Sequence, residues 1–198
     1  MKYIELIKKI KDPIFSLQDL KLLNLQVYPY QLSMWTKKGY LIKIKNGLYA
    51  LSENNNTLRN EYIAFNLYQP SYVSLEWALS KYGLIPEMVY NCVSVTTKAT
   101  RTFQNSFGLF VFRHIKKELF FGYKKINDNG QVYLIAEPEK ALFDYLYLNL
   151  SKIKNQADVD ELRLNEFEIK KLNKSKIKKF ASLANNKKLD LILKLILK

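Results

Sequence analysis

Residues 28–51, YPYQLSMWTKKGYLIKIKNGLYAL, combine lysines, aromatic rings and short polar side chains. Lysine binds phosphate oxygens, glutamine can pair bidentately with adenine, serine can bond either kind of base edge, and methionine or tyrosine can contact a thymine methyl. The stretch therefore predicts contact with duplex DNA; the alternative is a solvated lysine face above a core of aromatic rings. The candidate DNA-contacting residues are Tyr30, Gln31, Ser33, Met34, Lys37, Lys38, Lys43, Lys45 and Asn46.

An acidic group in AEPEKALFDYLYL offers different chemistry. Clustered carboxylates beside a lysine can hold Mg²⁺ and activate water, so Glu137, Glu139 and Asp144 with Lys140 raise the alternative of a Mg-dependent nuclease. Glu137 and Glu139 flank Pro138, however, at an expected helix start, where acidic side chains interact well with unpaired N–H groups. We therefore expect a structural role for this group and no catalytic residue.

Histidine and cysteine each occur once, as His114 and Cys92. Neither has a second His or Cys at ligand spacing, so the sequence predicts no metal site, no cofactor and no nucleophile paired with histidine. We expect His114 to pack or to cap a strand, and Cys92 to be a small buried hydrophobe. A single cysteine fits a reducing compartment, and no stretch approaches ~18 apolar residues, so a cytoplasmic location is expected.

The formal charge of +14 comes from 32 Lys plus Arg against 18 Asp plus Glu. Such an excess favours a polyanionic partner, because each phosphate that is neutralised releases a counterion, although an AT-rich coding bias also enriches lysine. The charge is uneven: residues 1–53 carry 9 basic and 4 acidic groups, residues 54–150 carry 10 and 8, and residues 151–198 carry 13 and 6. The two ends are the basic parts.

The N-terminal elements that would position the lysines form a recognisable series. Apolar spacing predicts a helix before Asp12-Pro13, Ser16 resembles the N-cap of a second, and a third runs from Pro29 to Lys38 before Gly39. Runs 41–44 and 48–51, joined through Asn46-Gly47, predict a hairpin. Three helices and a two-stranded wing predict a winged helix-turn-helix DNA-binding domain over residues 1–53, with Leu32 and Trp35 facing inward.

The rest of the chain predicts a second unit at 58–198, after a polar linker at 52–57. Within 58–150, helices precede Pro70 and follow Ser74, and strands at NCVSVTT and GLFVFRHI alternate with period two. A third strand at 131–136 follows the NDNG turn, and a helix opens at Pro138. This is a mixed α/β region with a small antiparallel sheet, so the fold class is α+β. Residues 151–198 predict basic amphipathic helices, which could lie on a membrane surface but more simply pack on the preceding region.

Four segments in this order resemble a known family: KKGYLIKIKNGLYAL, PSYVSLEWALSKYGLIPE, VTTKATRTFQNSFGLFVFRHI and AEPEKALFDYLYL. Over about residues 3–150 the chain is similar to the AbiEi-type antitoxins of phage-defence operons. The resemblance implies a winged-helix regulator that represses its own operon at inverted repeats in the promoter. It also implies a type IV antitoxin that counteracts a nucleotidyltransferase-like toxin without binding it stably.

The resemblance also directs attention to basic side chains on the predicted strands. Lys98, Arg101, Arg113 and His114 lie on or between paired strands, which can gather side chains on one face, and are the candidates for antitoxicity. Such a cluster could contact nucleic acid or a substrate that the toxin uses. The alternative is a solvated sheet face.

Overall fold

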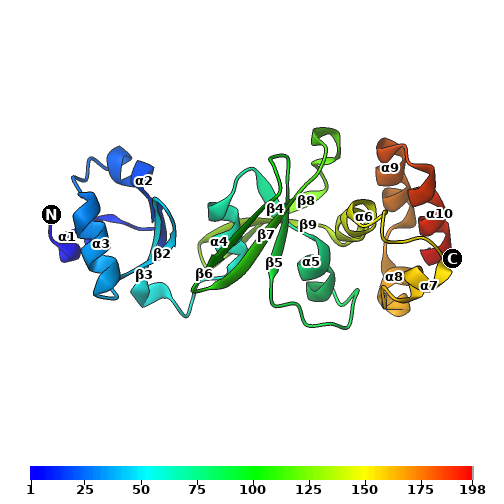
Figure 1. Cartoon of the computed structure of the whole chain (residues 1–198), viewed down its shortest axis with the longest axis horizontal. Coiled ribbons are helices and arrows are strands. Elements are labelled where there is room, and N and C mark those ends of the chain that lie inside the picture. Colours follow the sequence, from blue (N-terminus) through cyan, green and yellow to red (C-terminus); the bar gives the residue numbers. More distant parts are fainter. Residues whose placement is uncertain (198) are drawn as a thin grey trace.

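Three groups of elements follow one another along the long axis of the computed structural model, which describes residues 1–197, and its two ends lie at opposite extremes (Figure 1). The first group contains α1 (Tyr3–Lys9), β1 (Ile14–Ser16), α2 (Leu17–Leu22), α3 (Pro29–Lys37), β2 (Leu41–Lys45), β3 (Leu48–Leu51) and the 3-10 turn η1 (Ser52–Asn54). The whole is a mixed α+β structure, as predicted.

Local signals place the helices of the first group. Ser16 Oγ accepts a hydrogen bond from the Asp19 backbone N–H at 3.2 Å, and Asp19 Oδ2 accepts one from the Ser16 N–H at 2.6 Å, which satisfies unpaired groups at the start of α2. Pro29 occupies the first turn of α3, and Gly39, with φ of +74°, follows its end. The predicted third helix and hairpin are confirmed within about a residue.

The three-stranded sheet of this group buries both of its faces. Its order is β1-β3-β2, all antiparallel, and β1 was not predicted. One face packs with the helices into a core cluster of Leu6, Ile10, Phe15, Leu20, Leu25, Leu32, Trp35, Leu41 and Leu51. The other face contributes Ile14, Ile44, Leu48 and Ala50 to the larger core of the rest of the chain. The hairpin therefore lies between α3 and the next sheet.

The second group contains a six-stranded sheet in the order β6-β7-β5-β4-β9-β8. Its elements are α4 (Asn60–Leu67), β4 (Ser71–Val73), α5 (Leu75–Lys81), β5 (Cys92–Thr96), β6 (Arg101–Asn105), β7 (Gly108–His114), η2 (Lys117–Leu119), β8 (Tyr123–Asp128), β9 (Gln131–Ala136) and α6 (Pro138–Leu148). The expected small antiparallel sheet is corrected: β5 pairs parallel with β7, and β4 pairs parallel with β9. Strand pairs separated by a crossover are parallel here, which alternation alone does not reveal.

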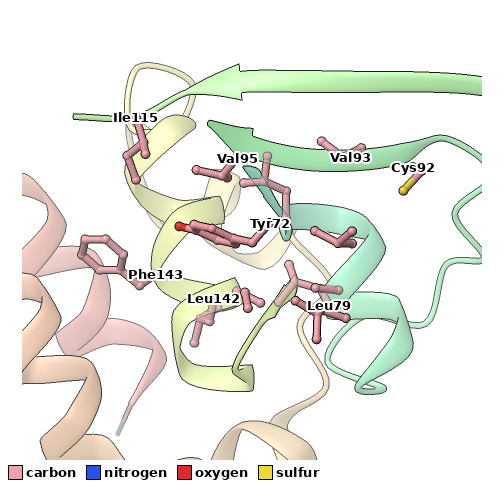
Figure 2. Close-up of a cluster of buried hydrophobic side chains, with 14 of the residues drawn as sticks. Tyr72, Leu79, Cys92, Val93, Val95, Ile115, Leu142 and Phe143 are labelled. Carbon is pink, nitrogen blue, oxygen red and sulfur yellow. The ribbon is translucent and has the colours of Figure 1, made fainter. Parts of the chain in front are cut away.

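A continuous apolar core lies between this sheet and its helices. Tyr72 from β4 projects between β5 and α6, close to Val95 and Leu142, and Leu79 approaches from α5 (Figure 2). Cys92 is buried, as expected, and burial raises the pKa of its thiol, which keeps the thiol protonated and unreactive.

The third group is helical and packs on α6. It contains α7 (Gln156–Asp160), α8 (Glu166–Lys171), α9 (Lys174–Ala184) and α10 (Lys187–Ile196). Phe180 of α9 lies 5.0 Å from the Phe121 ring and 6.1 Å from the Phe143 ring, centroid to centroid, so the basic segment is joined to the core by aromatic contacts. Within residues 1–197, no helix has the length and apolar character that crossing a bilayer requires.

The buried hydroxyl of Tyr82, which follows α5, should make the free energy of unfolding fall at alkaline pH. Its hydroxyl donates a 2.8 Å hydrogen bond to the Ala136 carbonyl, and burial raises its pKa from 10.0 to about 12, with Lys81 offsetting part of the rise. Because the folded pKa lies above the unfolded one, this contribution to stability is complete below pH 10 and is lost as pH rises towards 12. Urea unfolding across this window should show a shallower decline for Tyr82→Phe than for wild type.

The control for this experiment is Tyr90→Phe, which changes an exposed ring in the same way. It should leave the alkaline decline as steep as in the wild type. Identical pH profiles for Tyr82→Phe and Tyr90→Phe would contradict the role of Tyr82.

Candidate nucleic-acid interface

One face of α3 is open to solvent along its length. Tyr30, Ser33, Met34 and Lys37 lie three or four residues apart, which places them on one side of a helix, and all four are exposed. Leu32 and Trp35 lie on the opposite side in the first core cluster. Tyr30 is 67% exposed and Met34 39%, so large apolar surfaces remain in water beside a lysine. Lys38, which follows the helix, is also exposed.

Gln31 does not belong to this face, which corrects the expectation that it reads adenine. Its side chain is only 7% exposed. Its Nε2 donates to the Met1 carbonyl at 2.7 Å, and its Oε1 accepts from the Tyr28 backbone N–H at 3.0 Å. Both ends of the amide are therefore engaged in joining the chain start to the first turn of α3, and none of it is left for a base edge.

Replacing Gln31 should consequently reduce stability. Gln31→Ala leaves the Tyr28 N–H and the Met1 carbonyl without their side-chain partner, so we expect the free energy of unfolding to fall by about 1–2 kcal/mol. Urea unfolding measures this loss. Gln26→Ala, at an exposed glutamine in the loop before α3, is the matched control and should change stability little. An unchanged unfolding midpoint for Gln31→Ala would contradict this assignment.

The hairpin divides its polar residues between two environments. Lys43 and Asn46 are exposed, but Lys45 donates a hydrogen bond from Nζ to the Leu67 carbonyl, and its Nζ lies 5.8 Å from the Phe103 ring centroid. Burial lowers the pKa of Lys45, and the positive charges of Arg101 and Lys98 lower it further. Lys45 therefore joins the hairpin to the second group of elements, which corrects its assignment as a free phosphate contact.

The junction between β2 and β6 gathers several cations around aromatic rings. We define the junction cluster as Lys45, Lys98, Arg101, Tyr68 and Phe103. Arg101 lies over both rings, with Cζ 5.8 Å from the Tyr68 centroid and 5.7 Å from that of Phe103, and Lys98 lies 5.5 Å from Tyr68. Among residues 1–197, none of the ion pairs involves these three cations. The two rings were missed as site residues, although Arg101 and Phe103 lie two positions apart on β6 and therefore share a face of the strand.

The other two candidates for antitoxicity, Arg113 and His114, are neighbours in β7 and point to opposite faces of the sheet. His114 Nδ1 lies 3.0 Å from the Lys98 carbonyl oxygen, to which it donates when the proton is on Nδ1, and the side chain remains exposed beside the junction cluster. Arg113 donates from its guanidinium to the Leu148 carbonyl at 2.7 Å and to Asn149 Oδ1 at 3.2 Å. Arg113 therefore caps the end of α6. It points to the face of β7 opposite to its neighbour His114, because adjacent strand residues point to opposite faces, so it does not share a site with Lys98 and Arg101.

The acidic group does not assemble as a metal site. Asp144 has no exposed side-chain surface: Tyr72 Oη donates to its Oδ2 at 2.9 Å, Ser74 Oγ does so at 2.8 Å, and Lys140 Nζ donates to its Oδ1. Lys140 is equally buried, with Nζ 4.6 Å from the Phe143 ring centroid. Burial raises the pKa of Asp144 and lowers that of Lys140, and the attraction between the two opposes both shifts.

Glu137 and Glu139 face away from this buried pair. Lys176 of α9 lies 2.6 Å from Glu137 Oε2 and 3.8 Å from Glu139 Oε2, and Glu139 Oε1 accepts a hydrogen bond from the Asn173 backbone N–H. The two glutamates therefore hold the C-terminal helices against the start of α6. Asp144 has no exposed side-chain surface, and within residues 1–197 no group of His, Cys, Asp and Glu could hold a metal ion, so the trio does not form the nuclease centre considered from the sequence.

Neither a scan against protein-family models nor a search of curated proteins finds a match for this chain. The exposed side chains themselves therefore indicate which ligands the surface can bind. The open face of α3 offers apolar groups, a hydroxyl and lysines, which can bind phosphates and touch base edges.

Proposed function

We propose that the protein is a DNA-binding transcriptional repressor of its own operon, built on a winged helix-turn-helix at residues 1–53. The observation that supports this best is the element order α1, β1, α2, α3, β2, β3, with α3 exposed directly before the hairpin. In helix-turn-helix proteins the second helix of the motif enters the major groove, and here that helix is α3. The strand β1, which sequence patterns missed, completes the sheet beneath the helices in this arrangement.

The charge of α3 suits this role. The helix contains no Asp or Glu; it ends at Lys37 and is followed by Lys38, and both lysines are exposed. Lysines at the end of a helix lying in a groove reach the phosphates on its edge, while residues nearer its start reach base edges. Lys43 and Asn46 on the hairpin add two further contacts to the backbone. The operator we expect is a set of inverted repeats in the promoter, as the resemblance implies.

A binding experiment with the full chain tests the proposal. Fluorescence anisotropy should detect a complex with a labelled duplex from the region upstream of the gene, and the affinity should fall steeply between 50 and 200 mM salt, because phosphate contacts release counterions. A scrambled duplex of equal length is the control. No complex at 50 mM salt would refute DNA binding. Nicking of a plasmid in the presence of Mg²⁺ would favour an enzyme instead.

We also propose, from the resemblance, that residues 58–198 form an antitoxin domain that counteracts a nucleotidyltransferase-like toxin without a stable complex. The junction cluster is the part of this region best suited to a phosphate-bearing target, because Lys98 and Arg101 pair with rings and with no carboxylate of residues 1–197. Growth rescue during toxin expression should be lost with Lys98→Ala and Arg101→Ala. Arg113→Lys, at the cap of α6, should retain it.

A further inference from the structure

The proposed reading helix lacks the side chains that usually discriminate bases by paired hydrogen bonds. With Gln31 buried, the open face of α3 consists of Tyr30, Ser33, Met34 and Lys37. Bidentate recognition of guanine uses Arg or Lys, and that of adenine uses Asn or Gln. Only Lys37 could serve, and it lies in the last turn, where phosphate contact is favoured over base contact. Sequence discrimination must therefore come from other chemistry.

Tyr30 and Met34 are positioned to discriminate bases through apolar contacts. Tyr30 lies in the first turn of α3 and Met34 lies one turn further along, before Lys37, with 67% and 39% of their surfaces exposed. Tyr28, the N-cap, stacks on Tyr30 with ring centroids 5.9 Å apart and planes inclined by 13°, which extends the apolar strip and holds the Tyr30 ring. In the major groove the apolar group on a base edge is the 5-methyl of thymine, so these side chains match A·T pairs.

The same strip could in principle cover a second copy of the chain. Its charge argues against this occupant, because Lys37 and Lys38 lie at one end and α3 carries no carboxylate. Two copies packed through α3 would bring lysines together without compensation. A polyanion that also carries methyl groups satisfies both the lysines and the apolar strip.

We propose that α3 selects A·T-rich duplex DNA through the thymine methyl groups, with Tyr30 and Met34 as the specificity-determining residues. This inference rests on the proposed DNA-binding function and names its substrate class. Ser33, between them, can bond a base edge of either kind, and the lysines supply affinity without selection.

Removal of the methyl group alone tests the inference. The full-length protein is titrated against alternating poly(dA-dT) and against poly(dA-dU), in which hydrogen-bonding groups and phosphates are the same and only the 5-methyl is missing. With two methyl groups buried against side chains, binding to the thymine duplex should be about tenfold tighter. Alternating poly(dG-dC) should bind about as weakly as the uracil duplex.

Matched variants assign the effect to residues. Tyr30→Ala with Met34→Ala should bind the thymine and uracil duplexes equally, with little change in thermal unfolding, because both side chains are exposed. Tyr90→Ala with Met88→Ala removes the same two side-chain types from a loop where they are 80% and 76% exposed, and should keep the tenfold ratio.

Several results separate failure of the inference from failure of the function. Equal affinity of the wild type for the thymine and uracil duplexes overturns the inference while DNA binding stands, as does a tenfold ratio that survives in the Tyr30 and Met34 variant. Dimerisation in solution that the same variant abolishes would assign the strip to a second copy and overturn it too. Absence of binding to all three duplexes would refute the DNA-binding function itself.

Discussion

Replacing Asp144 with alanine should lower the free energy of unfolding by about 3–5 kcal/mol, since it leaves the Lys140 ammonium buried without its counter-charge. Neither side chain of the pair has exposed surface, and Tyr72 and Ser74 also lose their common acceptor. The remaining partners of Lys140 Nζ are aromatic faces, of which Phe143 lies at 4.6 Å and Phe121 at 4.9 Å. Urea unfolding monitored by circular dichroism measures the loss.

The control removes both charges together. Lys140→Met combined with Asp144→Leu should recover the part of the loss that comes from the unpaired ammonium, because replacing a buried ion pair with apolar groups of similar volume is often close to neutral. The Tyr72 and Ser74 hydroxyls still lack their acceptor in this variant. A double variant as unstable as Asp144→Ala would show that shape, and not unpaired charge, determines the cost. Wild-type stability of Asp144→Ala alone would show that the pair contributes little.

Replacing Lys37 and Lys38 with alanine should weaken binding to every duplex without changing the preference among sequences. Each phosphate contact contributes about 0.9 to the slope of log affinity against log salt, so the slope should become shallower by about 1.8. At 0.1 M salt this corresponds to an affinity loss on the order of 50-fold. Anisotropy titrations at four salt concentrations provide both quantities.

Lys178→Ala with Lys179→Ala is the matched control for net charge. These two lysines are also adjacent and exposed, but they belong to α9 at the other end of the molecule (Figure 1). Their loss should leave the salt slope unchanged. An equal effect of the two double variants would mean that the overall positive charge of the chain, and no particular surface, attracts the DNA.

The parts of the fold that could be predicted are those determined by neighbouring residues. The Ser16 cap, Pro29 at a helix start and the Asn46-Gly47 turn each act within a few positions, so α2, α3 and the hairpin follow from sequence. Strands β1 and β4, at three residues each, are too short to show a period, and the parallel pairing of β5 with β7 depends on contacts distant in sequence.

The candidate site was predictable to the same extent. Helical spacing correctly predicted that Leu32 and Trp35 face inward and that Tyr30 and Met34 are exposed to solvent. It could not reveal the burial of Gln31, since that depends on the carbonyl of a residue thirty positions away. In the same way, the hydrogen bond from Lys45 to the Leu67 carbonyl depends on how β2 meets the end of α4, which no local pattern contains.

The sheet that contains the hairpin after α3 belongs to both hydrophobic cores. One of its faces packs on the N-terminal helices, and the other contributes to the larger cluster through Ile14, Ile44, Leu48 and Ala50. Asn105 of β6 also donates to the Ile44 carbonyl at 3.2 Å. Unfolding of either core would expose apolar residues of the other to water. We therefore expect one cooperative denaturation, with a denaturant dependence set by the whole chain, in place of two successive steps.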